Sequence, residues 1–215
     1  MTTVVDPIVR LRLPHEAQRR FVDSEAKRII IRAGRRGGKT VGVAIRSVRR
    51  FLQGRRVLYA APTQEQVDAF WYEVKRSLAD PIDRGVFSKN ETMHIIERIG
   101  TKQRIRAKTA WNADTLRGDY ADDLILDEWQ LMDEDAWELV GAPMLADNNG
   151  DVVFIYTPAS LHSRSISKAR DPLHAAKMFK KAAGDTSGRW AAFTFTSQAN
   201  PYISQVALTE LAQDM

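Results

Sequence analysis

Cysteine is absent from this 215-residue chain, and so is any long apolar run. Without cysteine the chain can hold neither a disulfide framework nor a zinc ribbon, and it has no thiol nucleophile. No stretch approaches the roughly 18 consecutive apolar residues that a membrane-spanning helix needs. The N-terminal segment also lacks the apolar core of a secretion signal. These absences predict a soluble protein of a reducing cytoplasm with no part in a membrane.

Histidine is scarce as well, with four residues in the chain. They are scattered without metal-ligand spacing, and no Ser-His-Asp order suggests a nucleophilic triad. The sequence therefore indicates surface or core histidines at His15, His94, His162 and His174.

Charge is distributed unevenly along the chain. The 32 basic and 27 acidic residues leave a net charge of +5. Residues 119–150 hold ten acidic residues and no Lys or Arg, so the rest of the chain is strongly basic. A basic body with one acidic segment is compatible with nucleic acid binding, and a merely solvated basic surface is the alternative. The same two readings apply to the basic stretch 160–190, whose cations are Arg164, Lys168, Arg170, Lys177, Lys180, Lys181 and Arg189.

Apolar runs alternate with segments of helical periodicity, which predicts an α/β domain with a mainly parallel sheet. Short runs rich in β-branched and other apolar residues are typical of buried strands, and the turn at Gly100-Thr101 favours a hairpin. The expected strands are 28–32, 57–61, 124–126, 152–156 and 191–196, with a hairpin over 92–109. The expected helices are 41–52, 63–78 and an acidic helix over 133–145 that Pro143 interrupts or ends, followed by a short helical pattern after Pro201.

A glycine-rich loop lies between the first strand and the first long helix. Glycines let backbone N–H groups turn towards phosphate oxygens, and the helix N-terminus adds the positive end of its dipole. In such a phosphate loop Lys39 bridges the β- and γ-phosphates, and the Thr40 hydroxyl is placed to ligate Mg²⁺. Ala33 replaces the usual first glycine. The expected nucleotide-binding residues are Gly34, Arg35, Arg36, Gly37, Gly38, Lys39 and Thr40.

Two carboxylates, Asp127 and Glu128, follow the apolar strand 124–126. A carboxylate at a strand end beside a phosphate loop can hold Mg²⁺, and its neighbour can orient and deprotonate the attacking water. We therefore assign Asp127 to the metal and Glu128 to the water. An acidic loop after a strand is common in itself, but the phosphate loop some ninety residues earlier strengthens the assignment, with strand 57–61 intervening.

At this point the sequence resembles a family. The phosphate loop GRRGGKT at 34–40, Leu-Arg-Gly at 116–118 upstream of LILDE, and Tyr-Thr-Pro at 156–158 are similar to motifs of the large terminase subunit of tailed double-stranded-DNA phages. The resemblance covers residues 14–200. It implies a RecA-like P-loop ATPase fold, with a twisted, mostly parallel sheet flanked by helices. It also implies ATP hydrolysis that drives double-stranded DNA into a viral procapsid, with ATP and Mg²⁺ as cofactors.

The resemblance assigns further roles residue by residue. Gln18 matches a glutamine that contacts adenine, and a surface glutamine on an N-terminal helix is the alternative. Arg35 matches a phosphate-loop arginine that senses the γ-phosphate in cis. Arg117 matches an arginine finger that reaches the neighbouring subunit, and its alternative is a structural ion pair with a following aspartate such as Asp119 or Asp122. Thr157 matches the motif that couples hydrolysis to domain movement, which often reads Ser-Thr-Pro or Thr-Thr-Pro, and here Tyr156 takes its first place.

The resemblance also bears on domains and partners. Residues 1–200 are expected to form the packaging ATPase domain, with 160–190 as a basic connector or lid and 201–215 as the start of a linker. Large terminases continue into a nuclease domain, which this sequence lacks, so either a domain cut from a longer protein or a naturally short one is expected. The implied partners are double-stranded DNA, the portal protein, the small terminase subunit and further copies in a ring, in the host cytoplasm. One RecA-like half of a helicase and a non-hydrolysing nucleotide- and DNA-binding module are the alternatives.

Overall fold

The computed structural model describes residues 6–158 and 167–213, and one sheet runs through the centre of the molecule. Its strands lie in the order β3-β4-β5-β2-β6-β7-β1-β8. The strands are β1 (Arg28–Ala33), β2 (Arg56–Ala61), β3 (Phe87–Asn90), β4 (Ile95–Arg98), β5 (Arg104–Thr109), β6 (Asp123–Leu126), β7 (Asp151–Tyr156) and β8 (Trp190–Phe195). The expected α/β fold with a mostly parallel sheet is confirmed.

All pairings from β5 through β8 are parallel. Strand β4 pairs antiparallel with both β3 and β5, so β4 alone runs against the other strands. The hairpin expected over 92–109 is β4 and β5, and β3 extends it by a strand that the sequence did not predict. In the sheet, β7 lies between β1 and β6. Strand β2 comes between β1 and β6 in the sequence, but in the sheet it lies on the side of β6 that faces away from β1. Parallel strands end at one edge, so the loops after β1, β6 and β7 are neighbours.

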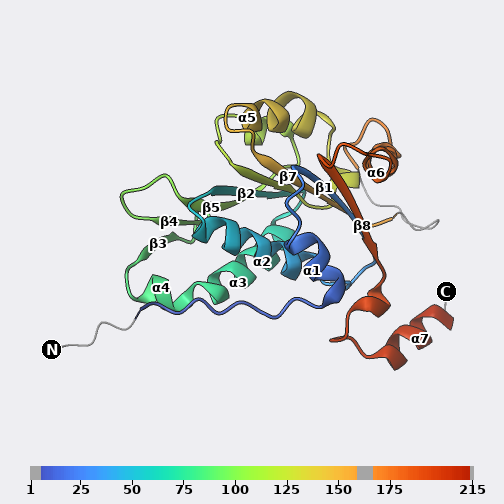
Figure 1. Cartoon of the computed structure of the whole chain (residues 1–215), viewed down its shortest axis with the longest axis horizontal. Helices are drawn as coiled ribbons and strands as arrows, with labels where there is room; N and C mark the ends of the chain where they lie inside the picture. The colour runs from blue at the N-terminus through green and yellow to red at the C-terminus, as the bar shows by residue number, and fades with distance from the viewer. Residues whose placement is uncertain (1–5, 159–166, 214–215) are drawn as a thin grey trace.

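Helices cover both faces of the sheet (Figure 1). One face carries α1 (Glu16–Val22), α2 (Lys39–Leu52), α3 (Gln64–Ser77) and the short α4 (Ala79–Asp83). The other carries α5 (Ala142–Ala146) and α6 (His174–Ala183). Helix α7 (Gln205–Gln213) stands at the C-terminal end, beside the turn that follows β8.

The two faces bury separate apolar clusters, as a sheet covered on both sides requires. The β1 residues alternate between them: Ile29 and Ile31 face the α1–α3 layer, and Ile30 faces the α5–α6 layer. Phe21, Phe51 and Phe70 fill the first cluster, where the ring of Phe70 stacks on Tyr59. Trp129, Phe154 and Leu124 are among the fully buried residues of the second.

Capping boxes mark the starts of α1 and α3. Thr63 caps α3 in a reciprocal box with Gln66. The acidic helix expected over 133–145 differs, because a π-helical segment over Ala136–Gly141 leads directly into α5. The change from the π-helical to the α-helical segment falls at Ala142, next to Pro143, and α5 ends three residues later at Ala146. The helix is thus altered beside Pro143 but does not end there.

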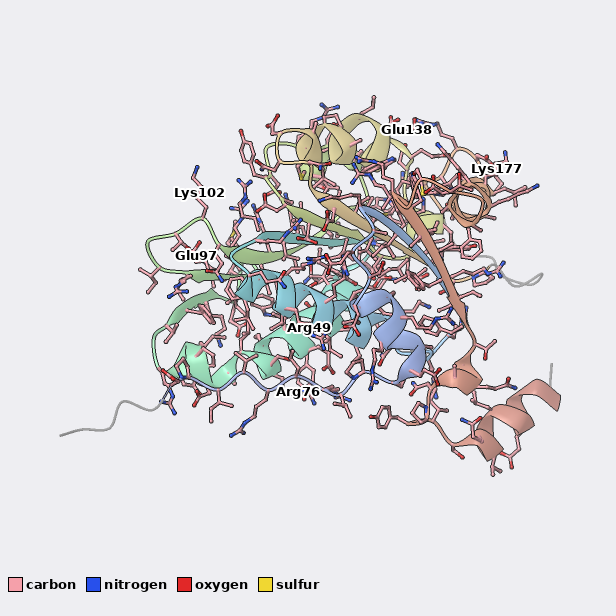
Figure 2. The ribbon with its side chains drawn as sticks, viewed as in Figure 1. Arg49, Arg76, Glu97, Lys102, Glu138 and Lys177 are labelled. Atoms are coloured by element: carbon pink, nitrogen blue, oxygen red, sulfur yellow. The ribbon has the colours of Figure 1, made fainter. Side chains whose placement is uncertain are left out.

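The basic stretch 160–190 is described from residue 167 onward, and Arg164 lies outside the described residues. Its central part is α6, which packs on β1 and β8. The lysines Lys177, Lys180 and Lys181, referred to below as the α6 lysines, are exposed, and Figure 2 shows Lys177 at the rim of the molecule. Within the described ranges, none of the helices combines the length and apolarity needed to cross a bilayer.

Candidate active site

The glycine-rich loop turns sharply between β1 and α2. Arg36 and Gly38 have φ angles of 59° and 86°, a backbone region that glycine enters without strain. Arg35 and Arg36 are exposed, and Thr40 is half-buried in the first turn of α2. The loop thus has the strand–turn–helix context that a phosphate site needs.

The Lys39 ammonium group lies within this loop rather than in solvent. Its side chain is 9% exposed, and Nζ donates to the carbonyl oxygens of Ala33 at 3.3 Å and Gly34 at 3.4 Å. A third donation reaches Oγ1 of Thr157 at 2.7 Å. Because β7 lies beside β1, residues 118 positions apart in sequence meet here.

Glu128 completes a chain of contacts with Lys39 and Thr157. The Thr157 hydroxyl donates to Oε1 of Glu128 at 3.2 Å, and Lys39 Nζ lies 3.9 Å from the same oxygen. Glu128 has a φ of 51°, so the backbone turns at once after β6 and directs the carboxylate back towards the phosphate loop. The structure therefore brings together three of the residues that the sequence selected, from three different strand ends.

Asp127 is buried behind Glu128. Its Oδ2 accepts a hydrogen bond from the Tyr59 hydroxyl at 2.6 Å, and its Oδ1 accepts one from the backbone N–H of Glu128 at 2.9 Å. Burial and then the charge of Glu128 raise the pKa of Asp127 to about 6. Asp127 and Glu128 place two carboxylates side by side at the phosphate loop, with Lys39 Nζ 3.9 Å from Glu128 Oε1. An Mg²⁺ ion, held by few carboxylates plus phosphate oxygens and water, suits that donor set.

Gln18 and His15 support the phosphate loop from α1. Gln18 is buried, its Nε2 donates to the carbonyl oxygen of Gly38 at 2.7 Å, and its Oε1 accepts from the His15 backbone N–H at 3.0 Å. His15 places ring Nε2 3.2 Å from the Gly37 carbonyl oxygen. The alternative of a surface glutamine is therefore wrong. A Cβ atom at position 38 would lie 2.6 Å from Gln18 Nε2, so this packing needs glycine.

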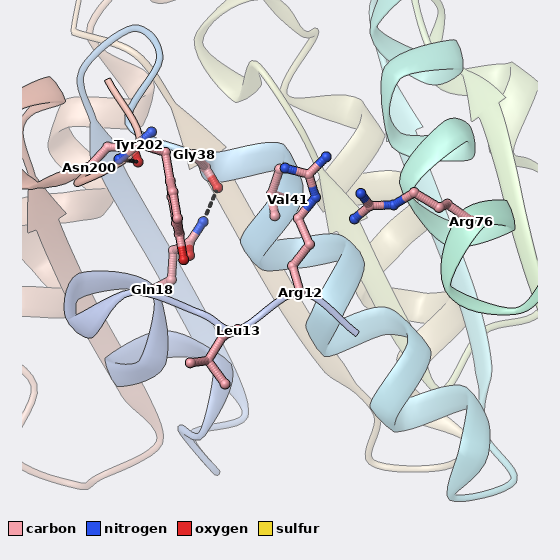
Figure 3. A pocket seen from close by; sticks show the side chains of 8 residues that line it. All are labelled: Arg12, Leu13, Gln18, Gly38, Val41, Arg76, Asn200 and Tyr202. Atoms are coloured by element: carbon pink, nitrogen blue, oxygen red, sulfur yellow. Dashed lines mark hydrogen bonds between the residues drawn. The ribbon is translucent and has the colours of Figure 1, made fainter. Parts of the chain in front are cut away.

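A cavity of about 380 Å³ opens beside Gly38 and Gln18 (Figure 3). Arg12 and Arg76 point towards one another across it, and both pair with Glu73, at 3.1 Å and 2.9 Å. Its remaining lining residues are Leu13, Val41, Asn200 and Tyr202. The combination of apolar walls, an exposed phenol ring and amide groups next to a phosphate loop suits a base and its sugar.

The two arginine candidates occupy different places. Arg35 stands at the tip of the phosphate loop, where its carbonyl oxygen accepts a hydrogen bond from Ser197 Oγ at 2.6 Å. Arg117 follows the 3₁₀ turn η1 (Ala113–Leu116), is 60% exposed, and its Nε lies 2.5 Å from Asp114 Oδ1. The alternative role of Arg117, an ion pair with Asp119 or Asp122, is not formed among the described residues. Asp119 instead forms ion pairs with Arg106 and Lys108, both at 2.7 Å. Asp122 forms one with Arg56 at 2.8 Å.

Three contributors escaped the sequence reasoning: His15, Tyr59 and Gln130. The amide of Gln130 donates to Oε2 of Glu128. The sequence does mark Gln130, because it is a single polar residue in the apolar run that follows the acidic pair. The sequence signal for Tyr59 is weaker: it is a phenol within an otherwise apolar strand. His15 offered none, because its role depends on how α1 packs on the loop.

The fold and this constellation define a RecA-like α/β domain with a phosphate loop facing an acidic pair. Among solved structures, the chain is similar to large terminases of bacteriophages. It matches the ATPase domain of the Thermus phage P74-26 large terminase at 24% identity and a TM-score of 0.61, over 69% of this chain and 66% of that one. It matches the large terminase of the thermophilic phage D6E in complex with ADP at 15% identity and a TM-score of 0.67, over 94% of this chain and 50% of that one.

The large terminase of phage HK97 matches at 13% identity and a TM-score of 0.69, over all of this chain and 49% of that one. The chain thus spans about half the length of the D6E and HK97 proteins. No protein-family model matches the sequence, and no curated protein does. At these identities the likeness shows a shared fold, and the site residues must be argued from this chain itself.

Proposed function

We propose that this chain is the ATPase domain of a genome-packaging motor, which hydrolyses ATP to move double-stranded DNA into a viral procapsid. The observation that carries the proposal is the convergence of Lys39, Thr157 and Glu128 within 3.9 Å beside the phosphate loop. The terminase fold of the D6E protein, which has been solved with ADP and with ATP-γ-S, supports nucleotide binding at this loop.

In this proposal each group has a task that suits its position. Backbone N–H groups of residues 34–40 and the Lys39 ammonium bind the phosphates, while the Thr40 hydroxyl and Asp127 hold Mg²⁺. Mg²⁺ supplies charge neutralisation at the phosphates. Glu128 orients the attacking water and accepts its proton. The cavity beside Gln18 receives the base.

Thr157 couples the site to the rest of the domain. Its hydroxyl accepts from Lys39 and donates to Glu128, so it responds when Lys39 turns towards a phosphate. Arg35 is the candidate for sensing the γ-phosphate in cis. Arg117 is exposed at a different loop, which suits a finger offered to a neighbouring subunit in a ring. Portal protein, small terminase subunit and host cytoplasm belong to the same proposal.

The test is ATP turnover and nucleotide binding by the chain and its variants, with and without double-stranded DNA. Glu128→Gln should keep ATP binding and lose about 10²- to 10⁴-fold in turnover, because a general base is removed. Lys39→Ala should weaken triphosphate binding as well. Glu138→Gln, an exposed carboxylate elsewhere, is the matched control and should behave as the wild type. Near-normal turnover by Glu128→Gln would refute the assignment, and a chain that binds ATP without turnover would be the non-hydrolysing module.

A further inference from the structure

We infer that Gln130 is a positioning residue that holds the Glu128 carboxylate in its working orientation throughout the nucleotide cycle. The inference rests on the proposed function. Its first support is a direct contact, because Gln130 Nε2 donates to Oε2 of Glu128 while the Thr157 hydroxyl donates to Oε1 at 3.2 Å. Each carboxylate oxygen therefore has its own donor. A carboxylate held on both oxygens cannot rotate freely about its last torsion angle.

The turn that carries Gln130 is firmly anchored. Gln130 is the central residue of the 3₁₀ turn η2 (Trp129–Leu131). The neighbouring Trp129 is 1% exposed and packs its ring against Phe154 and His174, at centroid distances of 5.2 Å and 4.8 Å. The ring Nε2 of His174 also lies 2.9 Å from the Trp129 carbonyl oxygen. A side chain borne on such a turn is positioned by the core rather than by solvent.

Residues 167–168 also hydrogen-bond the backbone of this turn. Ser167 Oγ donates to the Gln130 carbonyl oxygen at 3.2 Å, and the Lys168 backbone N–H donates to the Leu131 carbonyl oxygen at 3.0 Å. Both carbonyl groups of the turn thus have partners. The backbone of Gln130 is held on the side of the core and on the side of residues 167–168.

The Gln130 contact is independent of the phosphate loop, unlike the Thr157 contact. Thr157 also accepts from Lys39 at 2.7 Å, so its hydroxyl must reorganise when Lys39 turns to a phosphate. Among the described residues the Gln130 side chain bonds only Glu128. Gln130 is therefore the donor that can stay on Glu128 when the Lys39–Thr157 contact breaks.

The test uses Gln130→Met, which keeps the length of the side chain and removes both polar atoms, and Gln130→Glu, which keeps an acceptor and removes the donor. Both variants should lower kcat for ATP by about 10- to 100-fold, the range of a lost hydrogen bond to a charged group, with KM and the affinity for a non-hydrolysable ATP analogue unchanged. The control is Gln103→Met, because Gln103 is another buried glutamine whose amide donates within the fold, to the Phe51 carbonyl oxygen. It should lose stability and keep kcat.

A double-mutant cycle separates positioning from a general structural effect. If Gln130 acts through Glu128, adding Gln130→Met to Glu128→Gln should cause no further loss of turnover. A direct readout without nucleotide is the side-chain amide resonance of Gln130 in a ¹H–¹⁵N spectrum, which Glu128→Ala should shift strongly. Full kcat in Gln130→Met, together with the loss in Glu128→Gln, would overturn this inference and leave the proposed function standing. An unmoved amide resonance would also overturn it. A wild-type chain without ATP turnover would refute both this inference and the proposed function.

Discussion

The end of β6 opposite the candidate site holds a buried charge cluster whose titration should set the pH dependence of stability. Asp123 pairs with Arg55 and, at 3.7 Å, with Arg50, and it lies close to the second carboxylate Asp151. Burial, opposed by Arg55 and reinforced by Asp151, raises the pKa of Asp123 from 3.8 to about 6. A carboxyl group with a raised pKa stabilises the folded state below pH 3.8, and this contribution is lost as the pH rises through 6.

The size of the effect follows from the shift. At 1.36 kcal/mol per pKa unit, the Asp123 contribution to the free energy of unfolding falls by about 3 kcal/mol between pH 3.8 and pH 7. Asp123→Asn removes this titration. Its stability relative to the wild type should therefore rise by about that amount over the same interval, whatever the absolute cost of the substitution. Asp127, whose pKa is raised in the same direction, contributes equally to both proteins and cancels in the difference.

The assay is urea unfolding followed by tryptophan fluorescence at several pH values between 4 and 7. Asp122→Asn is the matched control, because hydrogen bonds from Arg56 outweigh the effect of burial and lower the pKa of Asp122. Its contribution is present above the unfolded pKa and is lost only at lower pH, so its difference from the wild type should stay flat. Equal pH slopes for the wild type and Asp123→Asn would refute the reasoning.

Further tests address the site and its partners. Mixing Arg117→Ala subunits with Glu128→Gln subunits should partly restore ATPase activity under conditions of association, because one partner supplies the arginine and the other the base; a cis or structural arginine predicts no recovery at any ratio. DNA binding should be independent of sequence and fall steeply with salt, as phosphate contacts require, and charge reversal of the α6 lysines should weaken it; affinity that stays flat with salt would contradict an electrostatic surface. Tyr59→Phe keeps the stacked ring but removes the bond to Asp127, so urea unfolding should show a loss of about 1.5–3 kcal/mol that disappears in an Asp127→Ala background, which has no acceptor. An equal loss in both backgrounds would mean that the hydroxyl acts elsewhere.

Much of the fold could be predicted from the sequence because its signals are local. The β-branched run of β1, the glycines after it and the helical periodicity of α2 lie within one continuous segment. The same holds for the acidic pair after β6. The helix over 133–145 was mispredicted in detail, since periodicity cannot distinguish a π-helical turn from an α-helical one when both bury the same side chains.

The sequence by itself determined which residues could do phosphate and water chemistry, because each motif is contiguous and its residue types are dictated by that chemistry. Tertiary structure alone decided which of them meet. Thr157 reaches Lys39 because β7 pairs with β1, and Tyr59 reaches Asp127 because β2 pairs with β6. Strand order is set by non-local pairing and by burial on both faces of the sheet. No local pattern records that order, so the partners of Glu128 and Asp127 became visible only once the strands were side by side.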